Sequence, residues 1–98
     1  EYSDFKTAQN NGKTVQVIGY PQKDLPMDYD GSKNLFTFTV KDEKQNIAKV
    51  VYNGSKPNNF DMAPMVVVKG KFADGNFVAD EVLTKCPSKY EGKMGKNQ

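Results

Sequence analysis

Few side chains in this sequence can do chemistry, because several reactive residue types are missing. Among the 98 residues there is no histidine, and Cys86 is the single cysteine. Histidine is the commonest general base and the commonest metal ligand in proteins. The sequence also lacks a Ser-His pair, a zinc-binding constellation and a glycine-rich phosphate loop. The composition therefore argues against an enzyme and leaves Cys86 as the residue to explain.

Cys86 lacks a partner for an internal disulfide, which leaves two interpretations. It is either a small buried filler at the end of a strand or a reactive, partner-binding thiol. The residues around it are basic: the 14 lysines include Lys85, Lys89, Lys93 and Lys96, opposed after residue 84 only by Glu91. Residues 1–84 hold 10 lysines against 11 acidic residues. The positive charge is thus concentrated at the C-terminus, where a solvated, flexible tail is the simplest interpretation.

An acidic cluster in the first long loop was compared with a calcium-binding pattern. Asp28, Asp30 and Ser32 fall at the first, third and fifth positions of an EF-hand loop. The sixth position, however, is Lys33, where that loop requires glycine, and no flanking helices are predicted. The cluster instead predicts a polar turn at Asp30-Gly31.

The elements that must position these residues are predicted from hydrophobic periodicity. A chain of 98 residues suffices for one domain. Apolar and polar residues alternate at period two over most of it, which is the signal of β-strands. Gly19 indicates a bulge or a sharp bend, and Gly70 interrupts the alternating pattern of its strand. The five predicted strands cover residues 13–20, 35–41, 46–53, 65–72 and 76–85.

The connections between these strands favour a closed barrel. Residues 42–45 and 73–75 are short enough to be hairpin turns. The longer connection, residues 54–64, contains a segment that can form one helical turn and plug the barrel end with Phe60. The prediction is an all-β, five-stranded OB-fold barrel with a flexible C-terminal tail. It divides into an N-terminal arm at 1–12, the barrel at 13–86 and the tail at 87–98.

The end of the last predicted strand resembles a known family. Residues 81–85 read Glu-Val-Leu-Thr-Lys and are followed by Cys86 and Tyr90. This segment resembles the end of the haem chaperones of cytochrome c maturation, the CcmE family, whose pattern is E-V-L-x-K-H-x-x-x-Y. Further matching elements at residues 35–42, 50–54, 57–60, 66–71 and 75–79 extend the resemblance over residues 13–90. Cys86 stands where most members have histidine, so the chain resembles the C-x-x-x-Y branch of the family.

The resemblance implies a function for each of these side chains. Cys86 would attach b-type haem covalently, since a thiol can add to a vinyl group of haem to give a thioether. Tyr90 would be the axial ligand of the haem iron, because a phenolate is a hard donor suited to ferric iron. Lys85 and Lys89 would contact the propionates. The small barrel is filled by its own side chains, so haem would lie outside it, on an apolar patch beside the last strand.

The resemblance also implies partners and a location. A haem chaperone receives haem from delivery and haem-lyase components of the maturation machinery and passes it to apocytochrome c. We therefore expect no nucleic-acid partner and a periplasmic location, with a membrane anchor upstream of Glu1. Whether Tyr2 and Phe5 cover the haem or simply follow that anchor is left open by the sequence.

Two other functions are alternatives to haem binding. OB-folds often bind single-stranded nucleic acid through aromatic side chains and a basic groove. Aromatic residues are present, but the barrel region is about neutral and arginine is absent. A protein-interaction module without a ligand is the second alternative. Denaturation-resistant haem would distinguish the chaperone from both.

Overall fold

Seven strands and two short helical segments make up residues 2–85, the part of the chain that this computed structural model describes. In chain order these elements are β1 (Tyr2–Ser3), α1 (Phe5–Asn11), β2 (Val15–Pro21), β3 (Asp28–Asp30), β4 (Leu35–Asp42), β5 (Ile47–Asn53), η1 (Phe60–Met62), β6 (Met65–Ala73) and β7 (Asn76–Lys85). The five predicted strands correspond to β2, β4, β5, β6 and β7, within two residues at each end. The elements absent from the prediction are β1, α1 and β3.

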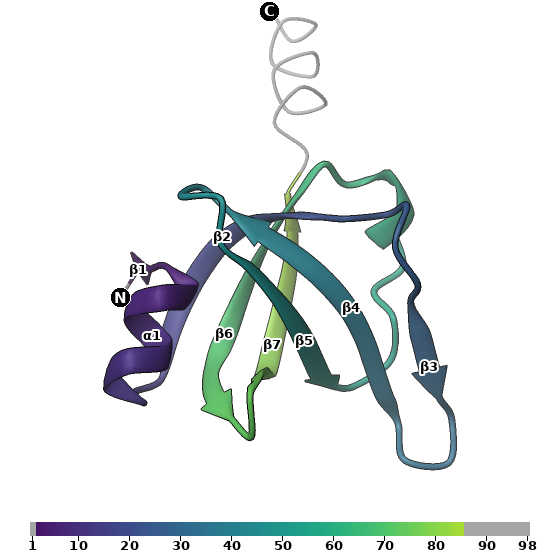
Figure 1. The fold of residues 1–98 in the computed structure, drawn as a ribbon. Helices are drawn as coiled ribbons and strands as arrows, with labels where there is room; N and C mark the ends of the chain where they lie inside the picture. The colour runs from purple at the N-terminus through teal and green to yellow at the C-terminus, as the bar shows by residue number, and fades with distance from the viewer. Residues whose placement is uncertain (1, 86–98) are drawn as a thin grey trace, which may run out of the picture.

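The five long strands close into a barrel (Figure 1). Neighbouring strands follow the order β2-β6-β7-β5-β4, and a further pairing of β2 with β4 completes the circle. All of these pairings are antiparallel except that of β5 with β7. Closure leaves the long strands with few free edges, which is how small barrels avoid edge-to-edge association. The prediction of an OB-fold barrel is confirmed in this topology.

Alternation of side chains along each strand separates the core from the surface. In β4, Phe36, Phe38 and Val40 are buried, and the threonines between them are half-buried on the outer side. The same alternation buries Val15 and Val17 of β2 and Val66 and Val68 of β6. The interior is therefore filled by the protein's own side chains, as expected for a barrel of five strands.

Phe60 closes one end of the barrel. It begins the 3₁₀ turn η1, is fully buried, and packs edge-on against Phe36 and Phe38 at ring-centroid distances of 5.1 and 4.9 Å. The predicted plug is confirmed, with its helical turn slightly later in the chain than expected. Lys23, in the loop after β2, donates hydrogen bonds to the carbonyl oxygens of Asp61 and Ala63 at 2.7 and 2.8 Å, which fixes the turn in place.

Two glycines permit close approach of the strands. Gly19 pairs with Asp42 of β4 and with Val66 of β6, so β2 has a strand on both sides at this point. A Cβ atom at Gly19 would lie 2.9 Å from the carbonyl oxygen of Lys41. Gly70 follows a register shift between β6 and β7, which is the bulge that relieves strain in strongly curved sheets.

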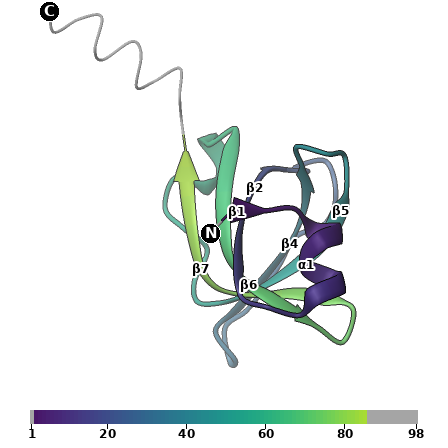
Figure 2. The same cartoon turned by 90° about the vertical axis from the view of Figure 1, so that its left-hand side faces the viewer.

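The N-terminal segment is folded against the barrel through the helix α1 (Figure 2). The Asp4 side chain caps α1 by accepting a 2.8 Å hydrogen bond from the Thr7 N–H, and Gly12 ends the helix in the left-handed conformation. Phe5 is only 2% exposed and packs against Phe72 and Phe77. It is thus a core residue, a role that the sequence did not reveal because the seven-residue helix buries only two side chains.

The first long loop contains β3, which pairs with β4 and was not predicted. The predicted turn at Asp30-Gly31 is confirmed: Oδ1 of Asp30 accepts hydrogen bonds from the Ser32 N–H and hydroxyl at 3.0 and 2.7 Å. Such a turn uses the acidic side chain to bond its own backbone. Within residues 2–85, no helix is long and apolar enough to cross a membrane.

Candidate functional site

The predicted site begins where β7 ends. Lys85 is the last residue of β7 and is exposed. Cys86, Lys89 and Tyr90 lie outside the described residues, and so does the expected flexible tail. The structure therefore defines the surface from which the chain continues toward Cys86.

The outer face of the barrel beside Lys85 is apolar. Ile18 of β2 pairs with Val67 of β6, which pairs with Leu83 of β7, so three apolar side chains form one row across three strands. All three lie on the outer side, because their chain neighbours Val17, Val66, Val68 and Val82 are buried in the core. Leu83 is 44% exposed, whereas Val67, between its two neighbours, is 4% exposed.

A second row on this face ends in a lysine at each side. Lys41 of β4 pairs with Tyr20 of β2, and Met65 of β6 pairs with Lys85 of β7. Gly19 pairs with Val66, so the next register step puts Tyr20 opposite Met65. Tyr20 is 40% exposed. We call Ile18, Tyr20, Met65, Val67 and Leu83 the outer patch; Lys41 and Lys85 flank it.

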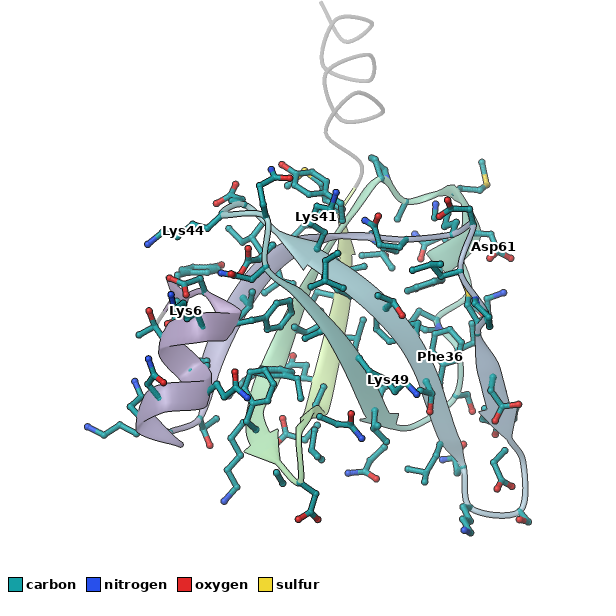
Figure 3. The ribbon with its side chains drawn as sticks, viewed as in Figure 1. Lys6, Phe36, Lys41, Lys44, Lys49 and Asp61 are labelled. Carbon is teal, nitrogen blue, oxygen red and sulfur yellow. The ribbon has the colours of Figure 1, made fainter. Side chains whose placement is uncertain are left out.

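Figure 3 shows Lys41 at the end of the barrel where β7 ends. Three strand spacings separate Lys41 from Lys85 in the sheet, about 14 Å along the hydrogen-bonding direction. The outer patch can thus accept a flat apolar molecule, with a cation available at either edge for acidic groups. Each exposed ion pair of this kind contributes about 0.2 to 1 kcal/mol.

The inner side of the same barrel end is sealed. The Thr84 hydroxyl donates a 2.8 Å hydrogen bond to Oδ1 of Asn59, which ties β7 to the connection that precedes η1. Directly beyond it, Phe60 fills the barrel mouth. A large planar ligand at this end would therefore have to bind on the outer face.

The carboxyl groups with perturbed pKa values lie away from the outer patch. Hydrogen bonds from the Thr7 backbone and side chain, together with the Lys44 ammonium at 3.1 Å, lower the pKa of Asp4. The Ser32 hydroxyl and the backbone N–H groups of Ser32 and Lys33 lower the pKa of Asp30. The hydrogen bonds that cause these shifts stabilise the start of α1 and the turn at Asp30. Neither carboxyl group is placed to act as an acid or a base at the outer patch.

Comparison with known proteins identifies the family. The CcmE domain family matches residues 2–93, which is nearly the whole chain. The chain belongs to the CcmE family. Its relatives include the cytochrome c-type biogenesis protein CcmE of Ehrlichia ruminantium strain Gardel, 35% identical over 86 residues. The CcmE proteins of Anaplasma marginale strain Florida and Nitrosomonas europaea are 35% and 36% identical over 91 and 81 residues.

These alignments cover most of this CcmE chain but only part of its relatives. The match to the Ehrlichia protein includes 83% of this chain and 61% of that protein, and the Nitrosomonas match includes 81% and 52%. The chain thus spans about three-fifths of the length of the first of these relatives.

Two solved structures have a similar fold. The OB-fold domain of the haem chaperone CcmE from Desulfovibrio vulgaris superimposes with a TM-score of 0.60 at 25% identity, covering 80% of this chain and 92% of that one. Replication protein A of U. maydis, solved with single-stranded DNA, gives a TM-score of 0.61 at 15% identity, covering 98% of this chain and 82% of that one. The second likeness shows the fold alone.

The sequence proposed Lys85 of this CcmE chain as a site residue, but it did not indicate that Lys41, Tyr20 and Met65 lie on the same face of the barrel. The alternation pattern marks Lys41 as outward, but it does not say which strand lies beside β4. The β2–β4 pairing that brings Lys41 next to Tyr20 joins residues about 20 positions apart, and it is decided by barrel closure. An outward-facing aromatic residue directly after Gly19 was the available signal.

Proposed function

We propose that this chain is the haem-carrying domain of a haem chaperone in cytochrome c-type biogenesis. It would hold haem covalently and transiently on the barrel surface and deliver it to apocytochrome c, without being an enzyme. Membership of the CcmE family supports the cargo and the pathway. The observation that carries the proposal for this chain is the outer patch, which includes Leu83, three residues before Cys86, and is flanked by Lys41 and Lys85.

The proposed attachment uses the C-x-x-x-Y variant of the family's motif. The Cys86 thiol adds across a vinyl group of haem, so that sulfur bonds one vinyl carbon and the proton goes to the other, with no net oxidation. Tyr90 supplies a phenolate to ferric iron; its ordinary pKa of about 10 means that coordination must displace the proton. Lys85 and Lys89 are the proposed propionate contacts, and the structure adds Lys41 as a third candidate.

Binding on an open face fits a carrier. The porphyrin would cover part of the exposed surfaces of Tyr20 and Leu83, and apolar burial of this kind contributes about 25 cal/mol per Å². The other porphyrin face would remain accessible to the delivery and haem-lyase components and to apocytochrome c. The covalent bond would replace the enclosure that a deep pocket provides. We place this work at the periplasmic face of the cytoplasmic membrane.

The test is haem that survives denaturation. Protein incubated with haem and a reductant is run on a denaturing gel and stained for haem, alongside the variants Cys86→Ala and, as a control of similar size on the inner side of the same barrel end, Thr84→Ala. We expect staining for the wild-type chain and Thr84→Ala and none for Cys86→Ala. Staining of Cys86→Ala would contradict covalent attachment through Cys86.

A salt titration with a single-stranded oligonucleotide tests the other class of function. Basic side chains that contact phosphates release bound counterions, so the affinity of a protein for nucleic acid falls steeply as the salt concentration rises. We expect only weak binding at low salt, because the barrel carries 10 lysines against 11 acidic residues up to residue 84. Tight, salt-sensitive binding in the absence of haem uptake would overturn the chaperone proposal.

A further inference from the structure

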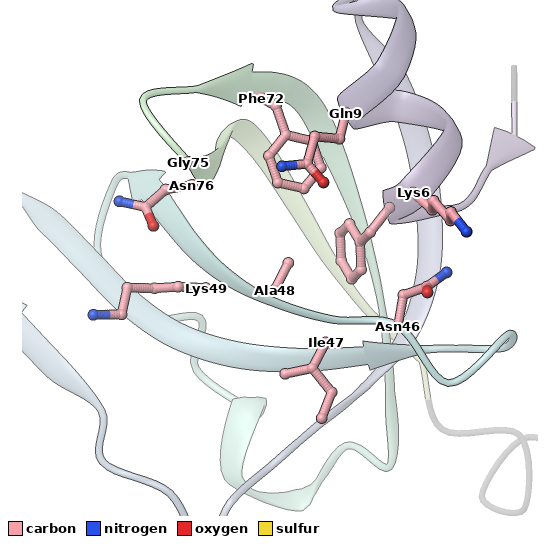
Figure 4. Close-up of a pocket in the computed structure, with 10 residues that line it drawn as sticks. Lys6, Gln9, Asn46, Ile47, Ala48, Lys49, Phe72, Gly75 and Asn76 are labelled. Atoms are coloured by element: carbon pink, nitrogen blue, oxygen red, sulfur yellow. The ribbon is translucent and has the colours of Figure 1, made fainter.

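A second feature lies near the other end of β7. A pocket of about 490 Å³ opens between α1, the first half of β5 and the hairpin that joins β6 to β7 (Figure 4). Phe5, Ala48 and Phe72 supply its apolar part, and Lys6 and Lys49 stand at its rim. We call it the edge pocket. Asn76, at the start of the ten-residue strand β7, lies about 30 Å from the Lys85 end of that strand, at a rise of about 3.3 Å per residue. On its other side the edge pocket comes close to the outer patch, because Ile47 pairs with Lys41 of β4.

One wall of the edge pocket is an unpaired strand edge. The Asp42 N–H donates to the Asn46 carbonyl at 2.8 Å, and β5 then pairs with β4 along its length. Backbone groups of successive residues point to opposite edges of a strand, so Ile47 and Lys49 direct theirs away from β4. On that edge the pairing with β7 begins only at Val50. A parallel bridge at Val50 is formed by its chain neighbours, so the Lys49 carbonyl belongs to the pairing with Phe77 of β7. Within residues 2–85, the N–H and C=O of Ile47 and the N–H of Lys49 have no strand partner on this edge.

The charge of the edge pocket has a single sign. Its lining includes Lys6 and Lys49 together with the amide side chains of Gln9, Asn46 and Asn76, and none of the described lining residues is acidic. Asp74 is close by in the hairpin, but it is exposed and does not line the pocket. Ile47, on the unpaired part of the edge, is 60% exposed.

We infer that the edge pocket binds an extended, acidic segment of a protein partner, which adds as a strand to residues 47–49 of β5. Strand addition takes its affinity from main-chain hydrogen bonds and its selectivity from alternate side chains. Here the carboxylates of the segment pair with Lys6 and Lys49, while apolar side chains between them contact Phe72 and Ala48. This proposal does not depend on haem binding.

Charge excludes two other occupants of this edge. A second copy of the chain would present the same lysine-flanked strand, and like charges would face each other across the pairing. The residues of this chain beyond 84 carry four lysines and one glutamate, so they have the wrong sign. Lysines on an edge can also serve only to prevent association, and that reading predicts no binding in the experiment below.

The test uses amide NMR of the haem-free chain with a capped heptapeptide of alternating valine and glutamate. We expect shifts confined to Ile47, Lys49, Asn76 and their neighbours, and slower hydrogen exchange of the Ile47 amide. The double variant Lys6→Glu/Lys49→Glu should bind at least ~3-fold more weakly. Lys13→Glu/Lys33→Glu, which changes the same charge at exposed positions elsewhere, should bind like the wild type.

Three control ligands make the outcome decisive. A peptide with lysine in place of glutamate should not bind, and a glutamate peptide N-methylated at alternate residues should lose most of its affinity because it cannot form the strand. Glutarate should cause no comparable shifts. Equal binding of the lysine or N-methylated peptide, the same shifts with glutarate, or no shifts with any peptide would each overturn the proposal.

Discussion

The backbone N–H of Phe5 donates a 2.9 Å hydrogen bond to Oδ2 of Asp42, a residue 37 positions later in the chain. The remaining partners of the Asp42 carboxylate are the N–H groups of Lys44 and Asn46 at 2.9 Å and the Asn46 side-chain amide at 3.1 Å. Each partner is a donor, so the buried carboxylate is fully used as an acceptor. One side chain thereby shapes the β4–β5 turn and fastens α1 to the barrel.

Removal of this carboxylate should destabilise the fold. Asp42→Ala leaves buried N–H groups without acceptors, at a cost of about 2 to 3 kcal/mol in the free energy of unfolding. Asp42→Asn should also be destabilising, because its NH₂ group would face donors. Urea denaturation measures both, with the exposed Asp28→Asn as the control for loss of one negative charge. A stable Asp42→Ala with α1 still attached would show that the hydrophobic contacts of Phe5 suffice.

Leu83 should contribute to non-covalent haem binding. We expect Leu83→Glu, made in a Cys86→Ala background, to raise the haem Kd about 5- to 30-fold, because a half-buried leucine contributes about 1 to 2 kcal/mol on full burial. Absorbance titration in the Soret region gives the Kd. Leu25→Glu is the matched control, since Leu25 is also a leucine, is 42% exposed, and lies in the loop between β2 and β3 outside the outer patch. Similar losses in both variants would argue against the outer patch.

Tyr90 should determine the ferric spectrum. Tyr90→Phe keeps the ring and removes the donor oxygen, so haem should stay attached through Cys86 while the ferric visible spectrum changes. Reduction should weaken the phenolate bond in the wild type, because ferrous iron is softer. The ferrous spectra of the two proteins should therefore be more alike than the ferric ones. Identical spectra in both oxidation states would remove Tyr90 from the coordination sphere.

Gly70 should tolerate no side chain. A Cβ at Gly70 would collide with the backbone of Val78 in β7, where no side-chain rotation can relieve the contact. We expect Gly70→Ala to lower the free energy of unfolding by about 1 to 3 kcal/mol. Gly31→Ala, whose Cβ would make an ordinary 3.7 Å contact with Tyr29, is the control. Equal stability of the two variants would mean that the bulge can shift its register.

Asp4 should make stability depend on acid pH. Its pKa is lowered from 3.8 in the folded chain, so the ionised form contributes stability above that ordinary value, and the contribution disappears as the pH falls through the folded-state pKa. Asp4→Asn keeps a capping oxygen but not the charge. The wild type should exceed Asp4→Asn in urea midpoint at neutral pH and converge with it in strong acid. A constant difference across this range would assign the effect to something other than ionisation.

The residues of the barrel show how far periodicity can predict a fold. Alternation in residues 35–41 identified Phe36, Phe38 and Val40 as core, because strand pattern and burial are local consequences of the same pleat. The same reasoning did not predict the helix at residues 5–11. Phe5 is the one large apolar side chain that this helix buries, and the position of the helix depends on a hydrogen bond to the distant Asp42.

The sequence by itself determined the five long strands, their order along the chain and the family. Its assignment of Lys85, Cys86, Lys89 and Tyr90 to a haem site stays a prediction. Only the tertiary structure decided that Lys41 and Tyr20 stand beside Met65 and Lys85, and that residues 47–49 keep an open edge next to Lys6. Side-chain direction is fixed within a strand by the local backbone. Which strands become neighbours is fixed by barrel closure, through contacts between residues far apart in sequence.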